Sequence, residues 1–375
     1  MPEFKPIPTP ATKYPKEIHG KLSDDQEAHR KTVLAHFNGH DYQIPDLVKG
    51  QLSDEEKFWL SNECILRYLR ATKWEPQAAI KRLEDTLKWR REYGLYDKVT
   101  AEHVEPEGVT GKEVVYGYDT HGRPCLYMFP SRQNTTEPER QLEFAVWMME
   151  RAVDLMGPGV EALDLMINFA DRSKNPTIAT ARTMLHIIQS HYPERLGLAV
   201  VINVPFLINA FFKLILPFVD PITRNKIKFN PTLFSSTSPT PSTPQPLISD
   251  SDTKTDITPE TPSLPSTLEP ESIFTPDMVM SSGWGGSRDF TYSHEEYWPA
   301  LVSLCTSRRA AQMSAWRALG GKVGISEWDV KCRAASSATF TGMTENSTSQ
   351  VNLAEKVAGG HVVGVSVMDT VPVVE

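Results

Sequence analysis

The chain lacks the sequence features that identify most metalloproteins, exported proteins and nucleic-acid-binding proteins. It has four cysteines in 375 residues, and none forms a CxxC or Cys/His metal pattern. We therefore expect buried thiols in a reducing compartment and no metal site. The first residues, MPEFKPIPTPATKYPKE, contain no apolar core of a secretory signal. The net charge of −8 argues against a surface that binds nucleic acid.

Motifs that carry common enzymatic chemistry are also missing. The sequence has no GxGxxG after a predicted strand, no GxxxxGK(S/T), no GxSxG and no HExxH. His186 and His191 lie five apart on a predicted helix, which is not a metal-ligand spacing, and the glycine cluster at 283–286 is typical of a turn. An unrecognised α/β enzyme stays an alternative, but we predict no catalytic residue.

Runs long enough to cross a membrane are absent too, although one stretch is unusually apolar. In 206–216 only Asn209 and Lys213 are polar, and their spacing of four places them on one narrow stripe of a helix. A bilayer requires roughly 20 apolar residues. A helix that is apolar nearly all round is either buried in a core or lies in lipid, and periodicity alone leaves both open. The basic cluster at 224–228 favours an anionic membrane surface.

Hydrophobic periodicity divides the chain into a helical unit and an α/β domain. Ser53 and Glu56 form a capping box that opens the helical unit. Apolar strands then alternate with amphipathic helices, which predicts an α/β fold with a partly parallel sheet. The predicted organisation is a loosely ordered segment 1–50, a helical unit 51–96, an α/β domain 97–318 with a disordered Ser/Thr/Pro-rich insert at 235–276, and a flexible tail 319–375. The insert is either a tolerated loop or an artefact of the gene prediction.

Seven motifs follow one another in a recognisable order. They are RYLRATKW at 67–74, LKWRREYG at 87–94, DTHGRPCLYM at 119–128, HYPERLG at 191–197, INVPF at 202–206, PFVDPITRNKI at 217–227 and HEEYWPAL at 294–301. Together they resemble the CRAL-TRIO lipid-transfer family, and within it the fungal phosphatidylinositol transfer proteins of the subgroup linked to azole and multidrug resistance. The resemblance covers about residues 53–318 without the insert. It implies a helical unit followed by an α/β domain whose sheet floors a lipid pocket under a mobile apolar gate helix.

The resemblance assigns the apolar stretch to this gate. Its gate residues would be Phe206, Leu207, Phe211, Phe212, Leu214 and Ile215. Fully burying one large apolar side chain is worth roughly 1.5–3 kcal/mol, so the gate should rarely open in water. At a bilayer the acyl chains replace water as its partner, and lipid would exchange without any bond being made or broken.

The resemblance also implies a headgroup site for phosphatidylinositol. The Glu of the family's PER motif and the Thr and Lys of its DPxTxxK motif are Glu194, Thr223 and Lys226 here. Lys226 can neutralise the phosphodiester, Thr223 can donate a hydrogen bond to it, and Glu194 can accept hydrogen bonds from inositol hydroxyls. Lys73 matches a further basic position of the family, whereas Thr72 stands where many relatives carry Arg.

Simpler roles for these residues stay open. The alternative for Glu194 is an ion pair with Arg195 or Arg182. The alternative for Lys226 is that it is a solvated surface lysine. For Arg67 and Arg70 the alternative to a ligand role is to tie the helical unit to the main domain.

One predicted strand, ALDLMINF, departs from the family pattern. Relatives that hold phosphatidylcholine place hydroxyl residues where Leu163 and Leu165 align, and leucine cannot hydrogen-bond a phosphate. We therefore expect phosphatidylinositol as cargo, poor phosphatidylcholine binding, and a sterol or another apolar lipid as second cargo. A sterol-binding module without inositol-lipid transfer is the alternative. The expected protein is a monomer without a cofactor that works in the cytoplasm and touches intracellular membranes, such as the endoplasmic reticulum or lipid droplets.

Overall fold

The computed structural model describes residues 2–11, 20–170, 178–204, 221–231, 233–234 and 273–336. The predicted gate, Phe206–Leu216, lies outside the described residues, and so does nearly all of the predicted insert. Within the described part of the chain, no helix combines the length and the apolar character needed to cross a bilayer.

The N-terminal helical unit forms as predicted, and it is larger than predicted. Its helices are α1 (Asp24–Phe37), α2 (Asp54–Trp59), α3 (Asn62–Ala71) and α4 (Pro76–Glu92). The capping box at α2 is present, because the Ser53 hydroxyl accepts from the Glu56 N–H while the Glu56 carboxylate accepts from the Ser53 N–H. The expectation that residues 1–50 are loosely ordered is wrong for α1, which buries Val33 and Phe37 in a core shared with α3 and α4.

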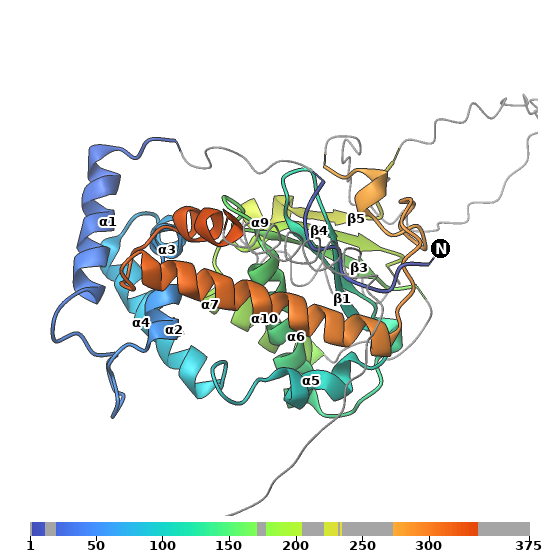
Figure 1. The fold of residues 1–375 in the computed structure, drawn as a ribbon, viewed down its shortest axis with the longest axis horizontal. Coiled ribbons are helices and arrows are strands. Elements are labelled where there is room, and N and C mark those ends of the chain that lie inside the picture. Colours follow the sequence, from blue (N-terminus) through green and yellow to red (C-terminus); the bar gives the residue numbers. More distant parts are fainter. Residues whose placement is uncertain are drawn as a thin grey trace, which may run out of the picture.

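The α/β domain is built on a five-stranded mixed sheet. Its elements are α5 (Ala101–Gly108), β1 (Glu113–Tyr118), β2 (Pro124–Met128), η1 (Pro130–Arg132), α6 (Pro138–Leu155), β3 (Leu163–Asn168), α7 (Ile178–His191), β4 (Leu196–Ile202), α9 (Pro221–Asn225), β5 (Ile227–Phe229), η4 (Pro276–Met278) and α10 (His294–Ala318). The strands lie in the order β1-β2-β3-β4-β5; β1 is antiparallel to β2, and the other pairs are parallel. The predicted α/β class with a partly parallel sheet is confirmed (Figure 1).

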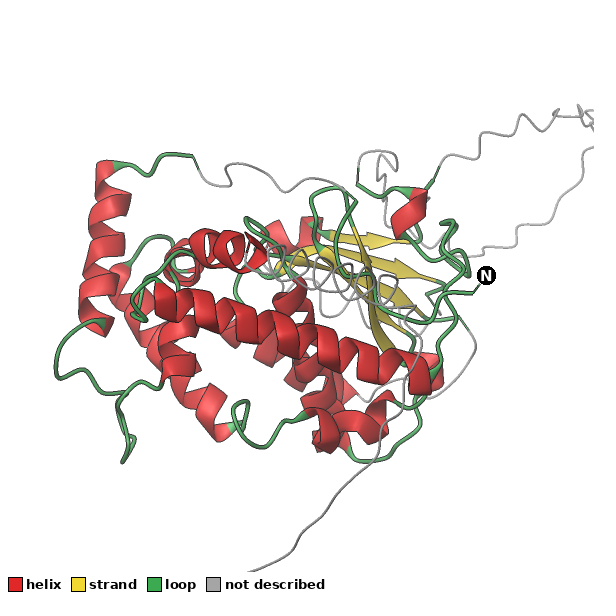
Figure 2. Ribbon diagram, viewed as in Figure 1, coloured by secondary structure: helices red, strands yellow, loops and turns green. Residues whose placement is uncertain are grey.

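The sheet has two different faces. Parallel strands that follow one another in sequence order require right-handed crossovers in one direction, which place α6 and α7 on the same face. The segment that precedes α10 covers the opposite face, where Trp284 packs edge-on against Tyr127 of β2 with ring centroids 5.3 Å apart. Figure 2 shows the strands fanned beside the helices, with α10 running from the sheet toward the helical unit.

Residues 319–336 are not a flexible tail, and this part of the prediction is wrong. Residues 327–336 are helical. Val330 packs in a small core with Met313 and Trp316 of α10, and all three side chains are at most 5% exposed. Backbone hydrogen bonds also join this segment to the helical unit, since the Gly324 N–H donates to the Leu60 carbonyl at 2.8 Å. The segment therefore closes the helical unit onto α10.

Candidate functional site

Two predicted headgroup residues meet where parallel strands begin. Glu194 lies two residues before β4 and Lys226 lies one residue before β5, and parallel neighbours begin at the same edge of a sheet. The Lys226 Nζ donates to the Leu196 carbonyl oxygen at 2.7 Å, which places its ammonium beside the start of β4. The fold therefore brings an acidic and a basic residue that are 32 positions apart in sequence to the same edge of the sheet.

The backbone at Glu194 is strained. Glu194 has a φ of 58°, in the left-handed region that favours glycine. It stands third in a four-residue turn in which Pro193 is second and the Arg195 N–H donates to the Tyr192 carbonyl at 3.3 Å. Tyr192 anchors the turn, because its hydroxyl donates to Glu150 at 2.7 Å. A non-glycine residue held in this conformation is typical of functional sites.

Thr223 and Lys73 are placed less directly. Thr223 lies on α9, three residues before Lys226, and its carbonyl oxygen accepts the Lys226 N–H at 3.1 Å. Thr223 is thus at the same sheet edge. Lys73 follows the end of α3, is exposed, and has a left-handed φ of 55°. Among the described residues no side-chain contact joins Lys73 to Glu194, Thr223 or Lys226.

Glu194 pairs with Arg70, which differs from both simple alternatives. Its carboxylate accepts a hydrogen bond from Arg70 Nε and not from Arg195 or Arg182. Arg70 Nη2 also lies 3.3 Å from the carboxylate of Glu161, in the loop before β3. The interpretation that Arg70 ties the helical unit to the main domain is confirmed. Arg195 instead donates to the Glu161 carbonyl oxygen at 2.8 Å.

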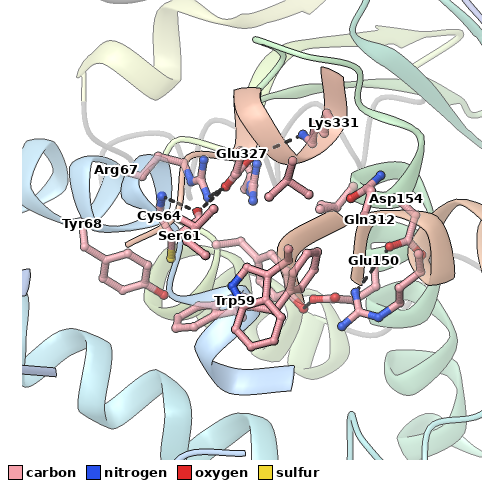
Figure 3. Close-up of a pocket in the computed structure, with 18 of the residues that line it drawn as sticks. Trp59, Ser61, Cys64, Arg67, Tyr68, Glu150, Asp154, Gln312, Glu327 and Lys331 are labelled. Atoms are coloured by element: carbon pink, nitrogen blue, oxygen red, sulfur yellow. Dashed lines mark hydrogen bonds and ion pairs between the residues drawn. The ribbon is translucent and has the colours of Figure 1, made fainter. Parts of the chain in front are cut away.

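Arg67 extends this set of ion pairs into the interior. Its side chain is 3% exposed and lies between two carboxylates: Nη1 is 2.7 Å from Glu161 and Nη2 is 2.7 Å from Glu327. Figure 3 shows Arg67 and Glu327 pointing toward one another, with Lys331 on the far side of Glu327. Burial by itself would raise the pKa of Glu327, but the charges of Arg67 and Lys331 hold it well below its ordinary value. Glu327 is therefore ionised at neutral pH.

The cavity beside Arg67 is too small to be the lipid site. It encloses about 70 Å³ between α2, α3, α6, α10 and the helix of residues 327–336 (Figure 3). A two-tailed phospholipid does not fit in a space of this size, which suits a few water molecules. Cys64, which lines this cavity, has a pKa raised to about 11 by burial, so it is a thiol and no nucleophile there.

The two leucines predicted to line an apolar wall lie on the sheet face opposite Trp284, where Leu163 is only 4% exposed. Leu163 and Leu165 of β3 share this face, and Leu165 is in register with Leu126 of β2 and Ala199 of β4. Leu165 is half-buried although β3 is the central strand, and so is Ile167 two residues on. Met166, which points to the opposite face, is completely buried. The central strand therefore keeps accessible apolar surface on one face only.

Two residues of this site were not predicted. Glu161 stands in a short loop without a motif, and Glu327 lies in the segment assigned to a tail. Ser326 and Glu327 do carry a local cue, because Ser-Glu before Trp328 is typical of a helix start. No sequence pattern indicates that their partners lie in α3.

Comparison with known proteins gives the following matches. The family described as "CRAL/TRIO domain" matches residues 109–239, and "CRAL/TRIO, N-terminal domain" matches residues 29–85. A CRAL-TRIO domain-containing protein of Schizosaccharomyces pombe is 41% identical over 333 residues, which cover 87% of this chain and 29% of that protein. The phosphatidylinositol transfer protein PDR17 of Saccharomyces cerevisiae is 36% identical over 333 residues, covering 83% of this chain and 84% of PDR17. The SEC14 cytosolic factor of Candida glabrata is 30% identical over 189 residues, covering 45% of this chain and 62% of that protein.

Proposed function

Because the chain belongs to the CRAL-TRIO family, we propose that it is a lipid-exchange protein that takes phosphatidylinositol out of a membrane and carries or presents it in an apolar pocket. The names of PDR17, a phosphatidylinositol transfer protein, and of the SEC14 cytosolic factor support this. The structural observation that supports this proposal is the apolar face of β3, on which Leu165 and Ile167 are only half-buried. This face begins at the sheet edge where Glu194 and Lys226 lie.

The headgroup chemistry follows from this arrangement. Lys226 neutralises the phosphodiester, the Thr223 hydroxyl donates a hydrogen bond to it, and Glu194 accepts hydrogen bonds from inositol hydroxyls. Lys73 adds positive charge near the mouth of the site. A carboxylate has about four acceptor positions, so Glu194 can keep Arg70 and still bind hydroxyls. The acyl chains lie against the apolar face, where about 0.8 kcal/mol per buried methylene offsets their removal from the membrane.

The wall formed by Leu163 and Leu165 sets the range of cargo. Two leucines offer no hydrogen bond to a choline phosphate, so phosphatidylcholine should be held poorly. The same wall suits a sterol or another lipid with a small polar part as second cargo. A sterol-binding module that does not transfer inositol lipids is the second candidate function, and native mass spectrometry of co-purified lipid separates the two.

The proposal needs neither catalysis nor a cofactor. No covalent bond changes, and the lipid is cargo. The protein would act as a monomer in the cytoplasm and meet intracellular membranes transiently. The gate side chains Phe206, Leu207, Phe211, Phe212, Leu214 and Ile215 would cover the lipid in water and contact the bilayer during exchange, which is a prediction from sequence for residues that the structure does not describe.

The first prediction tests the headgroup site. The full-length chain should move fluorescent phosphatidylinositol from donor to acceptor vesicles, and the double variant Glu194→Ala/Lys226→Ala should lose at least tenfold in rate. Removing two charge-assisted hydrogen-bonding groups costs roughly 1.5–3 kcal/mol each, and 1.4 kcal/mol corresponds to tenfold.

The double variant Lys81→Ala/Asp85→Ala is the matched control, because it also removes one acidic and one basic side chain and leaves the net charge unchanged. These two side chains pair with each other on the exposed side of α4, so this variant should transfer like the wild type. A Glu194→Ala/Lys226→Ala variant that transfers phosphatidylinositol at the control rate would show that the headgroup binds elsewhere. A wild-type protein that transfers no phosphatidylinositol would refute the proposed function itself.

A further inference from the structure

A continuous row of ion pairs joins the C-terminal segment to Glu194. Glu327 pairs with Arg67, Arg67 pairs with Glu161, Glu161 pairs with Arg70, and Arg70 pairs with Glu194. The exposed fraction of the side chains is smallest at Arg67, at 3%, and it rises to 18% at Glu327 on one side and through 24% at Arg70 to 36% at Glu194 on the other, so the row passes through the interior and leads out to the sheet edge. Its members come from α3, from the loop before β3, from the turn before β4 and from the helix of residues 327–336.

Glu327 is fixed at the C-terminal end of this row. Its N–H donates to Glu63 Oε2 at 2.6 Å, and the hydroxyl of Ser326 donates to the other oxygen of Glu63 at 2.8 Å. The hydroxyl of Ser61 donates to Glu327 Oε1 at 2.7 Å, the same oxygen that accepts from Arg67. Because backbone and side chain are both held, Glu327 has little freedom to follow a movement of Arg67.

We propose that Glu327 is a positioning residue of the headgroup site, which sets through Arg67, Glu161 and Arg70 how Glu194 faces a bound inositol lipid. This inference rests on the proposed function. Arg67 divides its two terminal nitrogens between Glu161 and Glu327. Glu161 Oε2 accepts from Arg67 Nη1 at 2.7 Å and also from Arg70 Nη2 at 3.3 Å. Arg70 is held from two sides, and Glu194 keeps acceptor positions for inositol hydroxyls.

Loss of the Glu327 charge would redistribute these pairs. The buried Arg67 would lose half of its partners and turn both terminal nitrogens to Glu161, because an unpaired buried charge is unfavourable. A guanidinium and a carboxylate fit each other in this two-bond arrangement. Arg70 would then lose Glu161 and bind Glu194 with more of its donors. Glu194 would have fewer acceptor positions left for the lipid.

The test compares Glu327→Gln with Asp329→Asn in the full-length chain. Asp329 lies on the same helix, is exposed, and forms no ion pair with a described residue, so the two variants lose the same charge in the same helix. We expect Glu327→Gln to transfer fluorescent phosphatidylinositol about three- to tenfold more slowly than Asp329→Asn, a range typical of residues that modulate a site through a network. Equal transfer by the two variants would overturn the proposal.

A second measurement separates positioning from a purely structural role. Both substitutions are repeated in an Arg70→Met background, where the connection from Arg67 to Glu194 is cut. Under the proposal Glu327→Gln has no further effect there, whereas a general loss of structure would slow transfer by the same factor in both backgrounds and would overturn it.

A third variant keeps the proposal testable if Glu327→Gln does not fold. Glu63→Gln weakens the attachment of Ser326 and Glu327 without touching Arg67, and it should slow transfer about two- to threefold. Unchanged transfer in a folded Glu63→Gln variant would overturn the proposal. If the wild type moves no phosphatidylinositol, the proposed function itself is contradicted. This result is obtained before any variant is compared, so it is distinguished from a failure of the Glu327 proposal.

Discussion

At the scale of single residues, Glu194 combines a proposed binding role with a backbone conformation that its side chain disfavours. The left-handed conformation costs a non-glycine residue roughly 1–2 kcal/mol. Glycine at this position would remove the strain, yet it would also remove the carboxylate that faces the sheet edge. Stability alone would favour glycine at this turn, so the glutamate agrees with the proposed binding role.

This conflict gives a prediction about stability. Glu194→Gly should be more stable than Glu194→Ala by about 1 kcal/mol, because both lose the pair with Arg70 but only alanine keeps the strain. Urea unfolding of the two variants measures the difference. At Asp85 inside α4 the same two substitutions should rank in the opposite order, because glycine destabilises a helix interior. If alanine equals glycine at position 194, the turn is not strained.

At the scale of elements, features with a local cause could be predicted from the sequence and features with distant causes could not. The capping box of Ser53 and Glu56 spans three positions, and Pro76 begins α4 where its missing N–H is harmless. The partner of Arg70 lies 124 positions away, and the partner of Arg67 lies 260 positions away. Such pairs depend on how complete elements pack, which periodicity does not encode.

The candidate site divides in the same way. Glu194, Thr223 and Lys226 could be named as candidates because each belongs to a short family motif, and parallel strands bring such motifs to one edge. The role of residues 319–336 was missed because a short helix after a glycine pair, at Gly320 and Gly321, has a weak pattern of its own. Its stability comes from α10 and from the helical unit, so only the folded structure reveals it.

The packing of this C-terminal segment can be tested directly. Val330 is 3% exposed against Met313 and Trp316, so Val330→Ala should lower the free energy of unfolding by about 1–2 kcal/mol. Asp329→Ala, on the exposed side of the same helix, should change it by less than about 0.5 kcal/mol. Chemical unfolding curves provide both values. A segment that behaves as a tail would give equal, negligible changes.

At the scale of the whole molecule, the proposed lipid replaces part of a hydrophobic core. The central strand β3 buries Met166 completely on one face and leaves Leu165 and Ile167 partly accessible on the other. Exposed apolar area costs about 25 cal/mol per Å² when water covers it. A protein that keeps such a surface inside its fold should be most stable when a ligand covers it. Under the proposed function, cargo binding and stability are therefore coupled.

Removal of the lipid should accordingly destabilise the protein. Ligand binding stabilises a folded protein by about 2.7 kcal/mol when the free ligand is a hundredfold above its dissociation constant. Delipidated protein should therefore melt several degrees lower and bind more of an apolar fluorescent dye than protein incubated with phosphatidylinositol vesicles. Phosphatidylcholine vesicles are the matched control and should restore little, because Leu163 and Leu165 offer no hydrogen bond to that headgroup. Identical melting of the three samples would mean that no lipid completes this core.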